Sequence, residues 1–227
     1  MSVRRYYWNP RGGERCFVDE TCFLFAFNKT QTVGTWSDLH VHPTWGELVY
    51  VSSGSIVMST GAGNFLGQKH RAIWVPPGLQ HEWYMPEACT NRTLFLHPSV
   101  FGGAPRFTQY HAIEMTPLLR ELIFAIDDLG VDVSTPEGAR LGRVLVDRLA
   151  QSKEVGAPLL IPRDHRLVEI CAELLNSPDT PVRLADWAAR LGVSEKTLSR
   201  RFLRQTGQTF GRCCRACACN TRSRRSR

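Results

Sequence analysis

The sequence predicts an α+β protein with a β-rich N-terminal region, two connecting helices and a small helical C-terminal region. Residues 15–110 contain short apolar and β-branched runs separated by Gly and Pro turn signals, which indicates antiparallel strands. From about residue 114 onwards, apolar positions recur with the spacing of amphipathic helices. Charge divides the chain similarly: residues 163–227 hold 14 Lys and Arg against 6 Asp and Glu, whereas residues 1–162 have a slight acidic excess. This asymmetry favours a polyanionic partner for the C-terminal region.

The β-rich region contains several strand-like runs of similar length. They are CFLFAF, ELVYVSSGSIVMST, HRAIWVPPG and TLFLHP. Regularly spaced short strands with Gly and Pro turns favour an antiparallel sandwich or barrel. We therefore expect the strands to form one β domain.

Two amphipathic helices are expected to follow the β domain, over residues 113–162. The first has an apolar face made by Leu118, Leu119, Leu122, Ile123 and Ile126. The second begins at the Ser-Thr-Pro-Glu sequence of residues 134–137, where Pro suits the first helical turn. Such a pair either forms a dimer surface or packs on its own strands, and the sequence leaves both alternatives open. Residues 154–162 are expected to be a linker.

Residues 184–207 contain a pattern typical of a helix-turn-helix. Gly192 permits a sharp turn between two helices, and Ser194 can cap the second one. The core face of the first helix consists of Leu184, Trp187, Ala188 and Leu191. In the second helix, Leu198 and Phe202 are expected to point inward.

The polar side of the second helix is the predicted DNA-binding surface. It consists of Lys196, Thr197, Ser199, Arg200, Arg201 and Arg204. A helix that carries basic and hydroxyl side chains in its N-terminal half suits the major groove of double-stranded DNA. The alternative is a helical hairpin whose outer face is merely charged.

The pattern A-x-x-L-G-V-S-x-x-x-L-x-R-x-F-x-x-x-T-G, from Ala188 to Gly207, resembles the AraC/XylS family of bacterial transcription regulators. The resemblance implies that residues 163–210 form the first helix-turn-helix of such a regulator, with an operator as partner. It also implies that Lys196, Ser199 and Arg200 face base edges. Arg201 and Arg204 would reach phosphates or pack at the rim.

Residues 211–227 are rich in Cys and Arg and depart from the family pattern at Cys213. Family members continue there into a helix with Arg-Leu-x-x-Ala and a second helix-turn-helix. Back-translation of residues 216–224 with G/C-rich codons recovers Arg-Leu-x-x-Ala in a shifted frame. We therefore expect an aberrant basic tail caused by a frameshift after about residue 212, and a truncated regulator that binds DNA weakly. A zinc-binding Cys cluster and a non-specific nucleic-acid tail are the alternatives.

The spacing G-x5-H-x-H-x4-E-x6-G, which runs from Gly34 to Gly54, resembles the first cupin motif. The second cupin motif is partial: Pro76, Gly78 and His81 are present, but Met85 stands where Asn is expected. The resemblance implies a small cupin-like β-barrel over residues 1–112, acting as an effector or dimerisation domain.

Four residues of these motifs form a candidate metal site: His40, His42, Glu47 and His81. His40 and His42 alternate on an expected strand and would therefore point to one face. Three imidazoles and one carboxylate suit Mn, Fe, Ni or Zn. The alternative is that the histidines are hydrogen-bonded inside the domain and hold no metal, so no cofactor is required.

The helix-turn-helix is the more specific motif, and so we expect a transcription regulator and not an enzyme. In this hypothesis, a small-molecule effector or a metal in the β domain changes how the helices pair or dock, in a chain that is a candidate homodimer. The alternatives are a metal-dependent cupin enzyme, of dioxygenase or isomerase type, with a DNA-binding remnant, and a domain that only dimerises. The chain shows no secretion signal and no apolar run near the roughly 20 residues that span a bilayer. We therefore expect a cytoplasmic protein with reduced cysteines and no membrane partner.

Overall fold

The computed structural model describes most of the chain between residues 23 and 212. The described residues are 5–7, 16–18, 23–61, 63–128, 135–154, 160–162, 164–176, 183–207 and 209–212. The expected aberrant tail lies outside them beyond residue 212, so the frameshift stays a prediction.

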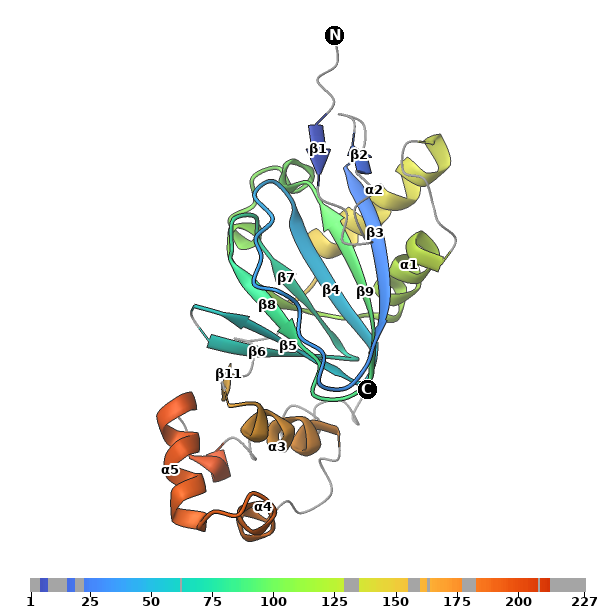
Figure 1. Cartoon of the computed structure of the whole chain (residues 1–227). Helices are drawn as coiled ribbons and strands as arrows, with labels where there is room; N and C mark the ends of the chain where they lie inside the picture. Colours follow the sequence, from blue (N-terminus) through green and yellow to red (C-terminus); the bar gives the residue numbers. More distant parts are fainter. Residues whose placement is uncertain are drawn as a thin grey trace.

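Eleven strands are found in the described residues, and all their pairings are antiparallel. They are β1 (Arg5–Tyr7), β2 (Cys16–Val18), β3 (Leu24–Gln31), β4 (Gly46–Ser53), β5 (Ser55–Thr60), β6 (Gly63–Gln68), β7 (Arg71–Val75), β8 (His81–Tyr84), β9 (Cys89–Leu96), β10 (His111–Glu114) and β11 (Leu160–Ile161). Strands β1 and β2 pair with each other, and the other nine form the main sheet (Figure 1).

The main sheet divides into two parts at the β6–β7 turn. Its strand order is β3-β9-β4-β7-β6-β5-β8, with β10 added beside β7 and β11 beside β6. Strands β6 and β7 share a single pair, Gln68 with Arg71. We call β3-β9-β4-β7-β10 the first sheet and β8-β5-β6-β11 the second sheet.

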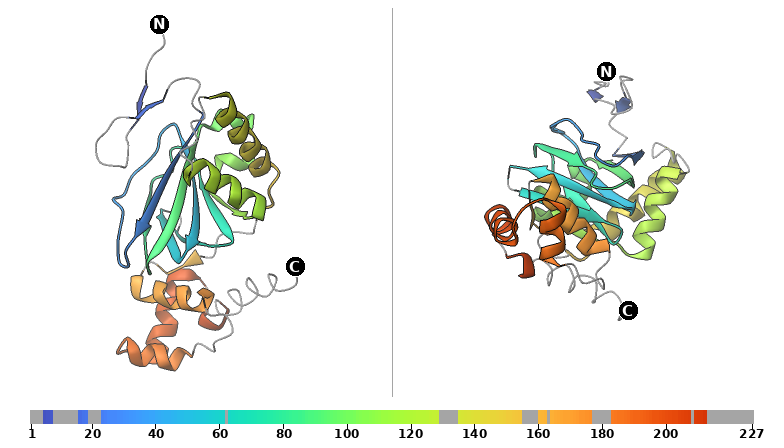
Figure 2. Two further views of the ribbon diagram at one scale, coloured as in Figure 1. Left: turned by 90° about the vertical axis from the view of Figure 1, so that its right-hand side faces the viewer. Right: turned by 60° about the horizontal axis from the view of Figure 1, so that its bottom comes forward.

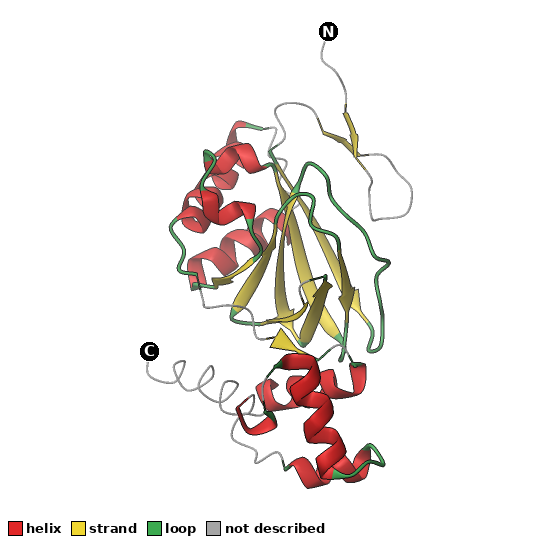
Figure 3. Ribbon diagram, turned by 90° about the vertical axis from the view of Figure 1, so that its left-hand side faces the viewer, coloured by secondary structure: helices red, strands yellow, loops and turns green. Residues whose placement is uncertain are grey.

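Helices flank the strands in two groups. The helices are η1 (Pro98–Phe101), η2 (Pro105–Thr108), α1 (Pro117–Asp128), α2 (Pro136–Ala150), α3 (His165–Asn176), α4 (Leu184–Arg190) and α5 (Glu195–Thr206). Figures 2 and 3 show α1 and α2 on one side of the strands, and α3, α4 and α5, here called the helical unit, at another. No helix in the described part of the chain is long and apolar enough to cross a membrane.

Both sheets bury both of their faces, which explains why the strands are apolar at successive positions. Along β4, Leu48 and Tyr50 belong to a core shared with α1 and α2, whereas Val49 and Val51 belong to a core between the two sheets. Successive strand residues point to opposite faces, so this division follows directly from the strand geometry. The second sheet meets the helical unit in a third core, which consists of Val57, Leu66, Tyr84, Leu167, Val168, Ile170, Cys171, Trp187, Ala188, Leu198, Phe202 and Phe210.

The prediction of mixed helices and antiparallel strands is confirmed. The closed cupin-like barrel is not found among the described strands, because the pairing path ends at β3 and at β8. The assignment of residues 1–112, 113–162, 163–210 and 211–227 to separate domains stays a prediction.

The two connecting helices pack on the first sheet of their own chain. Leu119, Ile123 and Leu149 are buried in the core that the helices share with this sheet. The prediction that Leu118 lies on the same buried face is wrong. Its side chain is 51% exposed, because it is rotated by about 100° from that of Leu119 and lies at the edge of the buried stripe. Helix α2 begins as expected, with the Thr135 hydroxyl accepting a hydrogen bond from the backbone N–H of Gly138.

The turn between α4 and α5 has the chemistry that the sequence indicates. Gly192 has φ +65°, a left-handed conformation that residues with a Cβ rarely adopt. Ser194 caps α5, because its hydroxyl accepts a hydrogen bond from the Thr197 N–H. Leu198 and Phe202 are fully buried, as predicted.

Candidate functional site

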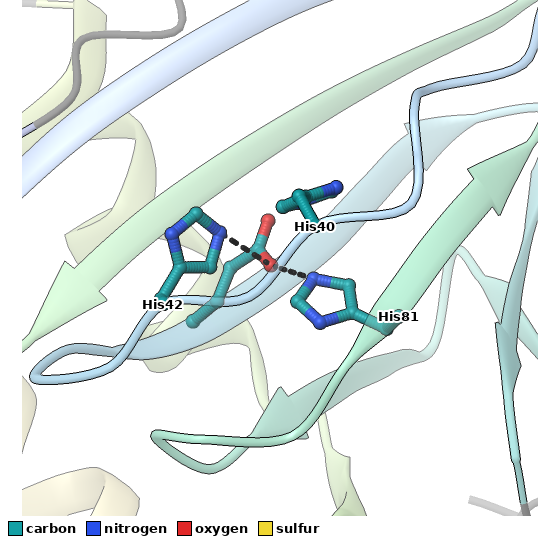
Figure 4. A group of neighbouring side chains, drawn as sticks. His40, His42 and His81 are labelled. Atoms are coloured by element: carbon teal, nitrogen blue, oxygen red, sulfur yellow. Dashed lines mark hydrogen bonds and ion pairs between the residues drawn. The ribbon is translucent and has the colours of Figure 1, made fainter.

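The four predicted metal ligands lie together in the structure. One ligand atom from each of His40, His42, Glu47 and His81 lies within 4.8 Å of the others (Figure 4). Glu47 is on β4 and His81 is the first residue of β8. We call these four residues the histidine cluster.

His40 and His42 reach the cluster by a route that we did not predict. They lie on the segment before β4 and not on a regular strand, where we expected them. An isolated bridge joins His40 to His81, and each backbone N–H donates to the other residue's carbonyl oxygen at 2.9 Å. This bridge and the hydrogen bonds between Ser37 and Trp83 fix the segment beside β8 and bring its imidazoles to the cluster.

The hydrogen bonds of His81 define the protonation of its ring and the nitrogen that could bind a cation. Its Nδ1 lies 2.8 Å from the Leu79 carbonyl oxygen, which can only accept, so Nδ1 carries a proton. Its Nε2 lies 2.8 Å from Oε2 of Glu47. A hydrogen bond there needs a second proton, on the ring or on the carboxyl group. A divalent cation between Nε2 and the carboxylate can take the place of that proton.

The electrostatics of the cluster follow from burial and from this pairing. Burial disfavours the charged form of each group, but the hydrogen bond and charges between Glu47 and His81 outweigh it. The pKa of Glu47 is therefore lowered, and the pKa of His81 is raised. Burial lowers the pKa of His42 to about 4, against the opposing effect of Glu47. At neutral pH, His42 is therefore uncharged and offers a lone pair.

Within the described part of the chain, one buried atom of the cluster has no hydrogen-bond partner. Nε2 of His42 is inaccessible to solvent and unpartnered, and it lies 3.7 Å from Oε2 of Glu47, too far for a hydrogen bond. Leaving a buried polar atom unsatisfied costs free energy, typically about 1–3 kcal/mol. The residues therefore fit a divalent metal, which would satisfy this nitrogen, and the N3O donor set suits Zn, Mn, Fe or Ni.

Aromatic side chains surround the cluster and hold its rings. The ring centroid of His42 lies 4.9 Å from that of Phe95, in an edge-to-face arrangement. Trp83 contacts His81 in the same manner at 5.6 Å. These contacts restrict the imidazoles and lower the local dielectric, which would strengthen their interaction with a cation held there.

The predicted DNA-binding residues lie on α5 as a short basic surface. Lys196, Arg200 and Arg204 are exposed and follow one another at intervals of four residues, so they lie on one side of the helix. Ser199 and Arg201 are half-buried. Thr197 is also half-buried, and its hydroxyl accepts a hydrogen bond from the Ser194 hydroxyl at 2.9 Å, so this side chain is part of the helix cap.

The structure also shows contacts that the sequence analysis missed. The buried amide of Asn64 on β6 donates from Nδ2 to the Pro162 carbonyl oxygen at 2.9 Å. Oε1 of Gln205 on α5 accepts from the Asp164 N–H at the same distance. Both bonds join residues more than 40 positions apart, and no local pattern in the sequence indicates them.

Comparison with known proteins places this chain near transcription regulators. No family model matches it. It is 26% identical over 178 residues to the HTH-type transcriptional regulator NimR of Escherichia coli strain K12, which covers 77% of this chain and 63% of NimR. The chain thus spans less than two thirds of the length of that relative.

Two solved structures show a limited likeness to this chain. The AraC-like transcriptional activator CuxR superposes with a TM-score of 0.47 and 14% identity, over 87% of this chain and 76% of CuxR. Apo ToxT from Vibrio cholerae superposes with a TM-score of 0.43 and 10% identity, over 86% of this chain and 80% of ToxT.

Proposed function

We propose that this protein is a transcription regulator that binds double-stranded DNA through α5 and a divalent metal through the histidine cluster. The observation that carries the proposal is the exposed basic side of α5, presented after a capped turn on a helix whose other side is fully buried. The similarity to NimR supports the same function. A regulator of this type has two distinct sites, one for an effector and one for an operator.

In this proposal, Lys196, Ser199 and Arg200 face base edges in the major groove. Arg can donate two hydrogen bonds to guanine O6 and N7, and Lys can donate to the same atoms. Arg201 and Arg204 lie further along the helix and contact phosphates, which position the protein without reading sequence.

The DNA-binding part of the proposal is tested with a duplex selected from a random-sequence library on the wild-type chain. Fluorescence anisotropy then gives the affinity for this duplex and for a scrambled one. Arg200→Ala is expected to weaken specific binding by roughly 5- to 150-fold, the value of one bidentate base contact. Arg140, an exposed arginine on α2 that pairs with Glu137, provides the matched control as Arg140→Ala. Equal losses in the two variants would contradict the role of α5.

The metal-binding part of the proposal rests on the donor set and on the unsatisfied Nε2 of His42. When bound, a divalent cation supplies positive charge and links the four side chains. Calorimetric titration with Zn²⁺ is expected to show one site per chain, and His42→Ala is expected to remove it. His70→Ala, which alters an exposed histidine outside the cluster, is expected to bind Zn²⁺ as the wild type does.

A second candidate function is a metal-dependent enzyme of the cupin type, a dioxygenase or an isomerase. It is favoured by the donor set, because four protein ligands leave coordination positions for a substrate on a six-coordinate metal. His40 is also only half-buried, so solvent reaches this side of the cluster. Substrate consumption by the Fe- or Mn-loaded protein, with no effect of metal on DNA binding, would favour the enzyme.

A further inference from the structure

Strand β8 contacts two different parts of the molecule with its two faces. His81 and Trp83 point toward the inside, where His81 joins the histidine cluster and Trp83 the core between the sheets. Tyr84, at the other end of this four-residue strand, belongs to the core shared with the helical unit and is only 5% exposed. The candidate metal site and the docking surface of the helical unit thus share one short strand.

The neighbouring segment, residues 36–42, also extends from the histidine cluster to the docking surface of the helical unit. It meets β8 through two isolated bridges, His40 with His81 and Trp36 with Tyr84, and Ser37 and Trp83 share two hydrogen bonds between them. The ring centroids of Trp36 and Tyr84 lie 4.4 Å apart. One bridge therefore lies at the cluster and the other at the helical unit.

From Tyr84 the packing continues into the proposed DNA-binding helix. Tyr84 shares its core with Leu167 and Ile170 of α3 and with Leu198 and Phe202 of α5. The side of α5 opposite its exposed basic residues is therefore part of the same packed core.

A second connection runs through the linker that enters the helical unit. Strand β11 pairs with β6, and the buried Asn64 amide holds the Pro162 carbonyl. Two residues later, the Asp164 N–H donates to Gln205 of α5. The helical unit therefore docks on the second sheet through an apolar core, and the linker between them is fixed by one hydrogen bond to β6 and by another to α5.

We propose that metal binding at the histidine cluster and docking of the helical unit on the second sheet are coupled through β8 and segment 36–42, so that metal tightens docking. This inference rests on the proposed metal site and adds the route by which its occupancy reaches the DNA-binding helix. By reciprocity, docking of the helical unit raises the affinity for metal by the same factor.

The direction of the coupling follows from how segment 36–42 is held. Two isolated bridges and a pair of hydrogen bonds between Ser37 and Trp83 hold it against β8. The side chains of Trp36, Leu39 and Val41 are nevertheless 48%, 56% and 47% exposed, so the segment has little packing of its own. A metal bound by His40 and His42 ties this segment to Glu47 and His81. The metal thus lowers the entropy that remains to be lost when Trp36 orders against Tyr84, and docking becomes more favourable.

Hydrogen exchange measured by mass spectrometry on the full chain tests the coupling, with Zn²⁺ or EDTA added. Zn²⁺ is expected to slow amide exchange in α3 and β11 by about fivefold or more in the wild type, the lower end of typical coupling between sites. Trp36→Ala is expected to bind Zn²⁺ but to lose most of this protection. Because Trp36 is half exposed, its removal leaves the buried cores in place.

Leu39→Ala is the matched control, since Leu39 is an exposed apolar residue of the same segment that forms neither bridge. It is expected to keep both Zn²⁺ binding and protection. A wild type that binds no Zn²⁺ overturns the metal site and this inference together. A wild type that binds Zn²⁺ with unchanged exchange in α3 overturns the coupling alone, and full protection in Trp36→Ala overturns the proposed route.

Discussion

The histidine cluster and the basic side of α5 are both made of ionisable side chains, but the fold treats them in opposite ways. In the cluster, Glu47 and His81 are buried, and each depends on the other for a hydrogen bond. On α5, Lys196 and Arg200 are exposed and well hydrated. Buried polar groups need a partner within the free protein, whereas exposed charges keep their solvation until a partner arrives. The difference supports the proposal of a cation site in the interior and of a DNA-binding site at the surface.

The largest effect is expected when the core beneath the basic side of α5 is disrupted and the histidine cluster is left intact. Phe202→Ala removes a fully buried ring from the core beneath the basic side of α5. Such changes typically cost about 3–5 kcal/mol, so we expect the helical unit to lose much of its stability and its DNA binding. Faster hydrogen exchange in α5 would show the loss of stability. A calorimetric titration that still shows a Zn²⁺ site would show that the histidine cluster stays folded. Leu203→Ala, at a neighbouring residue that is 47% exposed, is expected to change stability by less than about 0.5 kcal/mol.

The next largest effect is expected when the histidine cluster is altered and α5 is left intact. Glu47→Gln keeps the shape of the side chain but removes the negative charge that pairs with His81 and attracts a cation. We expect Zn²⁺ affinity to fall by at least about 100-fold, more than the loss of an outer-shell partner causes. Affinity for the selected duplex in EDTA is expected to stay at the wild-type value. Unchanged Zn²⁺ affinity in this variant would show that the metal binds elsewhere.

An effect of intermediate size is expected from the difference between the two buried histidines His81 and His111. Among the described residues, His111 has no hydrogen bond to a carboxylate like that of His81, and its buried Nε2 has no hydrogen-bond partner. Burial lowers the pKa of His111 below its ordinary value of 6.5, with a smaller opposing effect of the Gln109 carbonyl. The unfolded chain therefore binds more protons at this position, and the free energy of unfolding decreases as the pH falls below about 6.5. His111→Phe is expected to flatten this part of the stability–pH curve, as measured by urea unfolding between pH 5 and pH 8 (a window chosen to bracket roughly the ordinary histidine pKa).

The smallest effect distinguishes residues within the basic side of α5. Arg204→Ala removes a proposed phosphate contact, so binding is expected to weaken about equally for selected and scrambled duplexes. The slope of log K against log salt should decrease by about 1. Anisotropy titrations at several salt concentrations measure both quantities. A loss confined to the selected duplex would instead assign Arg204 to base recognition.

The two sites also differ in how far the sequence predicted them. The α4–α5 arrangement was predictable because its determinants are local: Gly192, Ser194, Leu198 and Phe202 all lie within one turn and one helix. The cluster members were predictable from their spacing, but the location of His40 and His42 off a regular strand was not. That location depends on pairing with His81, about 40 residues away in sequence. Docking of the helical unit was not predicted. Tyr84 and Asn64 contact residues that lie more than 80 positions further along the chain, and the sequence around them does not indicate such contacts.

In the proposed mechanism, one chain reads DNA with α5 and responds to metal through the histidine cluster. The most direct test is the affinity of the wild type for its selected duplex, measured by anisotropy in Zn²⁺ and in EDTA at fixed salt. We predict binding that discriminates against the scrambled duplex and that changes at least about fivefold with Zn²⁺. Equal affinity for both duplexes, unaffected by Zn²⁺, would contradict it.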